Sequence, residues 1–230
     1  MSHSYSALRD MLSTAKRCGK VLLEATRPLF DPSFELIRTA VAKIGRVRRV
    51  HFGYSQYSSR YDKFKAGEIL NAFNPEIGNS ALADIGIYPL ELCIALFGKP
   101  IDVKSSGVFL DNGFLAAGEI MLGYTDAVAS VTYSKVQDEF VPSVIEGELG
   151  SVIIEGVNKT SSVTLATRGG ERIALPYERR ANNMNYETEA FIRMVRGEED
   201  NTPYLAISEE AHRIVSQTYS DTGADKYIKV

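Results

Sequence analysis

The sequence has few of the features that would indicate a disulfide framework, a membrane span or a nucleic-acid surface. Its two cysteines, Cys18 and Cys93, lie far apart in helical patterns, so we expect buried apolar residues and not a disulfide or a metal cluster. It contains no run of ~18 uncharged apolar residues and no signal-peptide pattern, which predicts a cytoplasmic protein. The net charge of -3, with acids and bases interspersed, gives no electrostatic footprint for nucleic acid.

Two kinds of site motif are also missing from the sequence. No G-x-G-x-x-G follows a predicted strand, and the glycine pair at 147–150 is too short and lies between strands. No acidic residue stands where a dinucleotide fingerprint needs one to bind a ribose. His3, His51 and His212 lack metal-ligand spacing with any other candidate, so we expect no metal site.

What the sequence does contain is typical of a globular α+β protein. Its 230 residues are 44% hydrophobic, enough to bury one large or two modest cores. Alternating patterns predict strands at 47–57, 101–110, 114–124, 127–135, 141–148, 151–155, 162–167 and 172–176. Helical patterns lie at 6–19, 32–44, 80–97, 186–196 and 208–219, the last capped by Ser208. Short turns between the later strands predict a large, mainly antiparallel sheet with helices on one face.

Residues 1–30 form a separate unit in this interpretation. Leu8, Met11, Leu12 and Ala15 recur at helical spacing, and an apolar run of strand length follows at 21–25. A helix followed at once by a buried strand is half of an α/β unit, and its partner strands are missing from the sequence. We therefore expect a small remnant at 1–30 and an α+β domain at 31–230.

The segment 74–98 is the strongest candidate for a functional site. Asp84 and Tyr88 stand four residues apart and share one helix face. Pro89 removes a helical donor and disfavours the helical conformation for Tyr88, which predicts a kink or a new helix with Pro89 at its first position. Either outcome places the Tyr88 phenol at a backbone irregularity, where it can point into a cleft. The simpler alternative is a hydrogen-bonded pair on a helix surface.

The run Gly78-Asn-Ser-Ala-Leu-Ala-Asp84-Ile-Gly86-Ile-Tyr88-Pro89 resembles the active-site helix of the Gfo/Idh/MocA oxidoreductases, especially the dihydrodiol dehydrogenase-like members. The resemblance continues at 24–30, 45–50, 73–75 and 147–151, and therefore covers most of the chain. It implies that Asp84 and Tyr88 face a nicotinamide, with Tyr88 as proton donor or acceptor and Asp84 orienting the substrate or the phenol. It also implies NAD or NADP as cofactor, a sugar, polyol or dihydrodiol as substrate, and a homodimer formed through the open sheet face.

The resemblance further implies that residues 1–30 are the last helix and strand of a Rossmann domain. The family's Glu-Lys-Pro motif, whose lysine lowers the pKa of the tyrosine, does not occur in this sequence. We therefore expect a truncated chain that has the substrate half of the site without the cofactor fingerprint. One alternative is a non-catalytic dimerising or ligand-binding module that binds no cofactor; another is a shortened form of a complete enzyme.

Arg27 is a candidate substrate ligand because it follows the expected strand at 21–25. Open α/β sheets present ligand contacts at the carboxyl ends of their strands. The equally weighted alternative is an ion pair with Glu24 or Asp31.

Three further candidates flank the long segment 58–75, which we interpret as a functional loop. Tyr54 and Tyr57 belong to an aromatic and basic stretch that could line a pocket for a hydroxylated substrate. The alternatives are an exposed loop or, for Tyr54, a core position. Asn74 immediately precedes the key helix and could reach the pocket, or it could be a turn residue only.

Overall fold

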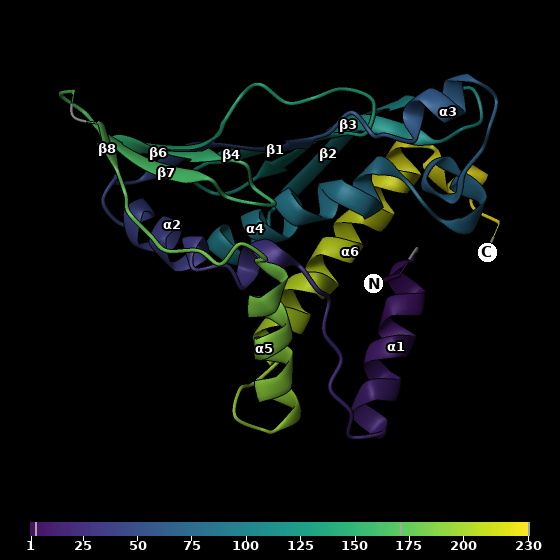
Figure 1. Ribbon diagram of the computed structural model, residues 1–230, viewed down its shortest axis with the longest axis horizontal. Coiled ribbons are helices and arrows are strands. Elements are labelled where there is room, and N and C mark those ends of the chain that lie inside the picture. The colour runs from purple at the N-terminus through teal and green to yellow at the C-terminus, as the bar shows by residue number, and fades with distance from the viewer. Residues whose placement is uncertain (3, 171, 230) are drawn as a thin grey trace.

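The computed structural model describes residues 1–2, 4–170 and 172–229, so His3 lies outside the described residues. Its centre is one eight-stranded sheet with helices packed against a single face (Figure 1). This arrangement confirms the predicted α+β class with a large sheet.

The elements follow the predicted ranges closely in the sheet and less closely in the helices. The strands are β1 (Val47–Ser55), β2 (Asp102–Phe109), β3 (Leu115–Gly123), β4 (Val128–Ser134), β5 (Ser143–Gly147), β6 (Gly150–Glu155), β7 (Ser162–Thr167) and β8 (Arg172–Ala174). The helices are α1 (Tyr5–Arg17), α2 (Ser33–Val41), α3 (Tyr61–Lys65), α4 (Ile87–Phe97), α5 (Met184–Val195) and α6 (Thr202–Thr222).

The strand order is β2-β3-β4-β1-β5-β6-β7-β8, which places the first strand of the chain in the middle of the sheet. β1 pairs in parallel with β4 and antiparallel with β5. The other neighbouring strands pair antiparallel. Because β1 and β4 run in the same direction, their carboxyl ends meet at one edge of the sheet, where Tyr54 pairs with Tyr133. The candidate site lies at this edge.

The core lies between the sheet and the helices. Val50 and Phe52 of β1 are buried toward the helices, and His51 between them is only partly buried. This alternation is the period-2 pattern that predicted the strand. α4 crosses the centre of the helix layer and buries most of its side chains, including Cys93, whereas Cys18 at the end of α1 is exposed, contrary to expectation.

The predicted strand at 21–25 is wrong. The segment has no sheet pairing and runs across the helix side of the molecule (Figure 1). Two of its polar groups contact the turn before α6 and α6 itself: Asn201 Nδ2 donates to the Leu22 carbonyl over 3.0 Å, and His212 Nε2 lies 3.0 Å from the Glu24 carboxylate. Because the described residues offer no neighbouring strand here, side-chain contacts replace the ladder.

The helix ends also differ from the prediction. α6 begins at Thr202, with Asn201 at the cap position and Pro203 in the first turn, so Ser208 is a buried interior residue instead of the cap. Proline fits the first turn because the amide groups there have no helical acceptor. In α5, Ala190 and Met194 are buried, whereas Phe191 and Val195 are exposed. In the part of the chain that the structure describes, none of the helices is long and apolar enough to cross a membrane.

Candidate functional site

The helix that carries Asp84 and Tyr88 is irregular close to where the sequence predicted a break. A π-helix, Leu82–Gly86, runs directly into α4. Pro89 is the third residue of α4, not the first, and it cannot donate to the carbonyl of Ile85, one turn back. A π turn closes its hydrogen bonds one residue later than an α turn, so it relieves the crowding that a proline ring causes inside a helix.

The start of this helix is held by α6. Ser80 Oγ accepts a hydrogen bond from the Ala83 amide at 3.0 Å and lies 2.7 Å from the Tyr219 hydroxyl. Both side chains are buried. The π turn is therefore fixed at its first residues by a contact between segments far apart in the sequence.

Tyr88 lies between Arg27 and Tyr54. The Arg27 guanidinium stands 5.6 Å from the centre of the Tyr88 ring, and the Tyr54 ring meets it edge-on at 6.1 Å. Burial raises the pKa of the Tyr88 hydroxyl above its usual range, and the positive charge of Arg27 offsets part of that rise. The phenol is therefore neutral near pH 7 and can donate a proton.

Arg27 forms neither of the two ion pairs that the alternative named, within the part of the chain that the structure describes. Glu24 pairs with His212, and Asp31 accepts a hydrogen bond from the Ser33 amide at 3.0 Å. Within the described residues neither carboxylate forms an ion pair with Arg27, whose contact is the Tyr88 ring.

Asp84 is paired with a buried lysine that the sequence did not single out. Lys135, just after β4, donates from Nζ to Asp84 Oδ2 at 2.6 Å and to the Ala72 carbonyl at 2.8 Å. Its ammonium also lies 5.0 Å from the Phe73 ring centre and 5.5 Å from that of Phe114. Lys135 is almost fully buried, whereas about half of the Asp84 side chain is exposed. Only the fold brings these residues together, because Lys135 reads in the sequence as the end of a strand.

Polar side chains that the sequence did not single out surround the Tyr54 hydroxyl. Asn158 Nδ2 donates to the Tyr54 hydroxyl at 3.0 Å, and that hydroxyl donates to Gln56 Oε1 at 3.1 Å. Asn183 Nδ2 lies 3.4 Å from the Asn158 carbonyl. Tyr54 and Asn158 line a cavity of about 580 Å³ that is bounded by β1, by the turn after β6 and by residues 139–143.

A buried carboxyl group, Glu187 of α5, lies near Arg27 and Tyr88. Its side chain is buried and its pKa is raised by burial, an effect that the charge of Arg27 partly offsets. The charge of Glu187 in turn raises the pKa of Tyr88. These mutual effects place Glu187 in the surroundings of both residues, although it is about 100 positions away from Tyr88 in the chain.

Two predicted ligands make contacts elsewhere. The Tyr57 hydroxyl donates to Asp62 at 2.7 Å and accepts from Lys65 Nζ at 2.7 Å, which ties it to α3. Asn74 Oδ1 accepts from the Glu76 amide at 3.0 Å and so caps a short 3₁₀ turn, as the turn-residue alternative predicted. The structure therefore gathers Arg27, Tyr54 and Tyr88, leaves Asp84 on the same helix with Lys135, and gives Tyr57 and Asn74 other contacts.

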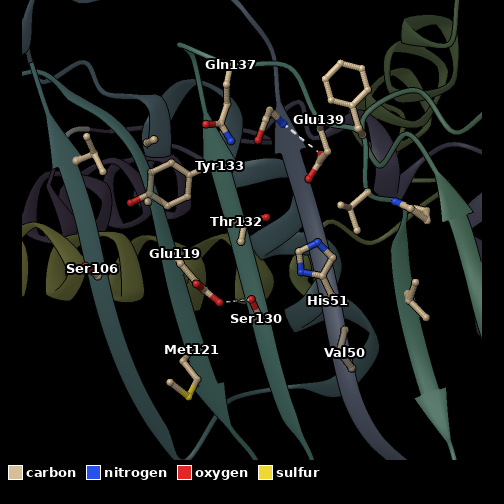
Figure 2. Close-up of a pocket in the computed structure, with 18 of the residues that line it drawn as sticks. Val50, His51, Ser106, Glu119, Met121, Ser130, Thr132, Tyr133, Gln137 and Glu139 are labelled. Atoms are coloured by element: carbon tan, nitrogen blue, oxygen red, sulfur yellow. Dashed lines mark hydrogen bonds between the residues drawn. The ribbon is translucent and has the colours of Figure 1, made fainter.

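A cavity of about 880 Å³ lies over the outer face of the sheet and does not include Tyr88. His51, Glu119, Ser130 and Thr132 project into it from neighbouring strands, and Glu119 accepts a hydrogen bond from Ser130 (Figure 2). Burial lowers the pKa of His51. Among the described residues no group of three or more His, Cys, Asp or Glu side chains could hold a metal ion.

Comparison with known proteins identifies the family. Residues 34–153 match the GFO/IDH/MocA C-terminal domain. The chain is 40% identical over 189 residues to the scyllo-inositol 2-dehydrogenase (NADP(+)) of Bacillus subtilis, covering 81% of this chain and 57% of that protein. It is 35% identical over 212 residues to an uncharacterized oxidoreductase of Escherichia coli, covering 92% of this chain and 65% of that protein.

Solved structures share the fold at low sequence identity. The aldose-aldose oxidoreductase of Caulobacter crescentus, complexed with glycerol, superposes with a TM-score of 0.81 at 16% identity over 97% of this chain and 68% of that one. A 3-ketoreductase of Actinomadura kijaniata gives a TM-score of 0.76 at 16% identity, over 96% of this chain and 67% of that one. The chain thus spans roughly three fifths of the length of its curated relatives, 57% and 65%. The family match and the sequence relatives together show that the chain belongs to the GFO/IDH/MocA family, of which it contains the C-terminal domain.

Proposed function

We propose that this chain provides the substrate-binding half of an NAD(P)-dependent oxidoreductase that acts on a sugar, polyol or dihydrodiol. The observation that carries the proposal is the neutral Tyr88 phenol held between Arg27 and Tyr54. The names of the relatives support the substrate class, since one is an inositol dehydrogenase and others are trans-1,2-dihydrobenzene-1,2-diol dehydrogenases.

In this proposal Tyr88 moves the proton of the substrate hydroxyl. A buried neutral phenol can donate that proton in the reductive direction, and the Arg27 guanidinium stabilises the phenolate that remains. Asp84 orients the substrate or the phenol, with its own position set by Lys135. The Asp84 and Tyr88 side chains would face the nicotinamide, which supplies or accepts the hydride when bound.

The donor set fits the nicotinamide end of such a cofactor, because it offers a neutral phenol and a half-exposed carboxylate instead of a metal site. We assign residues 31–230 to substrate binding and dimerisation and residues 1–30 to the junction with the cofactor domain. The phosphates and the ribose would be held by residues that match no part of this sequence, which has no glycine fingerprint.

We further propose that the outer sheet face forms a homodimer. Large apolar side chains are exposed on this face and on the connection that arches over it between β4 and β5 (Figure 1); they are Val108, Met121, Val128, Phe140 and Val141. Phe140 is 93% exposed. An apolar face of this kind is typical of an interface between subunits.

The test combines cofactor titration with turnover. Isothermal titration of this chain should show binding of scyllo-inositol but not of NAD(H) or NADP(H), because the sequence has no glycine fingerprint. Turnover is therefore assayed at the nicotinamide absorption band after the chain is joined to the part of the Bacillus subtilis relative that it does not cover. Tyr88→Phe should lower the turnover by about 10²- to 10⁴-fold, the range for loss of a general acid or base. Unchanged turnover in that variant would contradict the role of Tyr88. A joined protein that binds the cofactor and scyllo-inositol but shows no turnover would favour the non-catalytic module.

Light scattering tests the dimer. Met121→Glu places a charge among the exposed apolar side chains of the outer face and should convert a dimer to a monomer. Met184→Glu, on the exposed side of α5, is the matched control and should leave the dimer intact. A wild-type chain that is monomeric at tens of micromolar would overturn this part of the proposal.

A further inference from the structure

The carboxyl end of β1 has no strand beside it on the β5 side. β5 pairs with β1 only as far as His51. Beyond that point three amide groups donate to side chains that precede or begin β5: Gly53 to Ser143 Oγ at 3.0 Å, Ser55 to Glu139 Oε2 at 3.2 Å and Tyr57 to Asp138 Oδ1 at 2.9 Å. Side chains therefore take the place of a strand in this gap of the sheet.

The connection that supplies two of these side chains, residues 137–142, has few other attachments. Among the described residues, none of its backbone amide or carbonyl groups forms a hydrogen bond. Phe140 and Val141 at its tip are exposed. The carboxylates of Asp138 and Glu139 are therefore what holds this segment on β1.

The same connection separates two cavities. The cavity of about 880 Å³ over the outer face and the cavity of about 580 Å³ that includes Tyr54 and Asn158 are both lined by Ser55 and by residues 139–142. Movement of this segment away from β1 joins the two spaces. The Tyr54 hydroxyl then becomes accessible from the outer face of the sheet.

Glu139 fits against β1 because residue 53 is a glycine. A Cβ at position 53 would overlap the Glu139 carboxyl group, which lies beside β1 in Figure 2. Burial in this position raises the pKa of Glu139 to about 6, and the hydrogen bond from the Ser55 amide acts against the rise. A carboxyl group that moves into water regains its ordinary pKa, so proton binding and the position of the segment are linked.

Other charged and titratable groups border the same two cavities. The outer cavity includes Arg49, His51, Glu119 and Asp138, and the inner one includes Tyr54, Glu155 and Lys159. Burial and the Ser55 amide are what shift the pKa of Glu139, so the charges of these groups do not set it. His51 needs its own control, because burial lowers its pKa from an ordinary value of 6.5, which is close to that of Glu139.

We propose that residues 137–142 form a lid, which Glu139 holds on β1 while it is protonated and releases when it ionises. The closed lid separates the Tyr54 cavity from the outer face, and the open lid connects them. The closed state binds the proton more tightly than the open state. Acid therefore favours closing, and the lid opens as the pH rises through about 6. The inference does not depend on the reaction proposed for Tyr88.

Hydrogen exchange of the full chain measures the lid, because the Ser55 and Tyr57 amides are covered by lid side chains. After correction for the intrinsic effect of pH on exchange, the rates at these amides should rise by about tenfold between about pH 5 and about pH 7.5. The rates at Ile120 and Val131, in the paired strands β3 and β4, should stay unchanged.

Three variants separate the titrating groups. Glu139→Gln keeps the shape of the side chain and cannot ionise, so its Ser55 and Tyr57 amides should exchange at the slow rate at both pH values. Asp138→Asn is the matched control, because it makes the same change one residue earlier on an exposed side chain and should keep the wild-type dependence on pH. His51→Gln should also keep it. Thermal unfolding checks that each variant is folded.

The lid is overturned by rates in the wild type that do not depend on pH, or that rise equally in Glu139→Gln. An equal rise at Ile120 and Val131 would overturn it too, because the whole sheet would then be opening. Loss of the dependence in His51→Gln would assign the switch to His51 instead.

Phe140 and Val141 also belong to the proposed dimer face, so each measurement is repeated on Met121→Glu. The rise in exchange should persist in that variant. Its absence there would mean that dissociation of a dimer, and not Glu139, controls exchange at β1. None of these outcomes bears on the oxidoreductase proposal.

Discussion

Lys135 and Asp84 form an unequal ion pair, in which the cation is buried and the anion is half exposed, with 2.6 Å between Nζ and Oδ2. The ammonium also bonds the Ala72 carbonyl and lies near the rings of Phe73 and Phe114. The pair therefore joins the candidate catalytic helix to the small aromatic cluster beneath the 58–75 loop.

Because Lys135 is buried and Asp84 is half exposed, substituting each partner should lower the free energy of unfolding by a different amount. Asp84→Ala leaves a buried cation without its counter-ion and should lower the free energy of unfolding by about 2–4 kcal/mol. Lys135→Met keeps the apolar stem and leaves an aspartate that water can solvate, so it should cost only about 1 kcal/mol. Urea denaturation of both variants measures the difference. A larger loss in Lys135→Met would show that the lysine packing, not the charge, matters.

Arg27 should tune the titration of Tyr88. Because the guanidinium charge lowers the pKa of this phenol against the effect of burial, Arg27→Met should raise that pKa further. The ¹³Cζ resonance of labelled tyrosine, followed with pH, reports it directly. Arg38→Met, which removes an exposed arginine paired with Glu35, is the control and should leave the Tyr88 resonance unchanged. An unaltered titration in Arg27→Met would mean that the ring contact is not electrostatically important.

Glu139 should make the stability of the protein depend on pH. Burial raises its pKa from 4.5 to about 6. The Ser55 amide donates a hydrogen bond to this carboxylate and has a smaller, opposing effect on the pKa. The folded state therefore holds this proton more tightly than the unfolded chain. The stabilisation is fully present below pH 4.5 and is lost as the pH rises through about 6.

The corresponding variant is Glu139→Gln, which cannot ionise. Relative to it, the wild type should lose of the order of 1 kcal/mol of unfolding free energy between pH 4.5 and neutral pH, a value reduced for the partial exposure of the side chain. Parallel stability curves for the two proteins across this interval would rule out the effect.

The buried carboxyls Glu24 and Glu91 should respond oppositely to amide substitution. Burial acts to raise the pKa of Glu24, but the hydrogen bond and charge of His212 outweigh it and lower that pKa to about 2. Burial and the neighbouring Glu24 raise the pKa of Glu91 well above its usual range, which favours its uncharged form. Glu24→Gln therefore removes a needed charge and should cost about 2–4 kcal/mol, whereas Glu91→Gln should cost less than about 1 kcal/mol.

Urea denaturation at neutral pH compares the two variants. Glu24 stabilises the folded state because its pKa there is lower than the unfolded value of 4.5. This stabilisation is present above pH 4.5 and is lost as the pH falls toward 2. A greater cost for Glu91→Gln than for Glu24→Gln would mean that the proton resides on Glu24.

The strands of the sheet could be predicted from the sequence because the patterns that indicate them involve only neighbouring residues. Alternation of side chains along strands such as β3 and β4, and a polar turn such as Thr125-Asp126 between them, are visible within ten residues. The segment at 21–25 has the same apolar composition, yet whether a strand forms depends on a neighbour to pair with, and composition does not report that.

The site was predictable only in part for a related reason. Asp84, Tyr88 and Pro89 lie within one short segment, and their spacing identified them as candidates. Lys135, Asn158 and Glu187 come to the same region from three other elements, each beside residues that give no local sign of function. The proline inside the helical pattern predicted an irregularity in this helix. It did not predict that the irregularity is a π turn at 82–86.

The central position of β1 constrains the order in which the chain can fold. β1 ends at Ser55, but its neighbours β4 and β5 begin at Val128 and Ser143, so the strand has no partner until about 80 more residues have been synthesised. Pairings of such long sequence separation have a high entropic cost of loop closure and form slowly. During that interval the apolar run around Val50 and Phe52 is available to other chains. A nascent chain of this protein should therefore depend on chaperones until β5 has emerged from the ribosome.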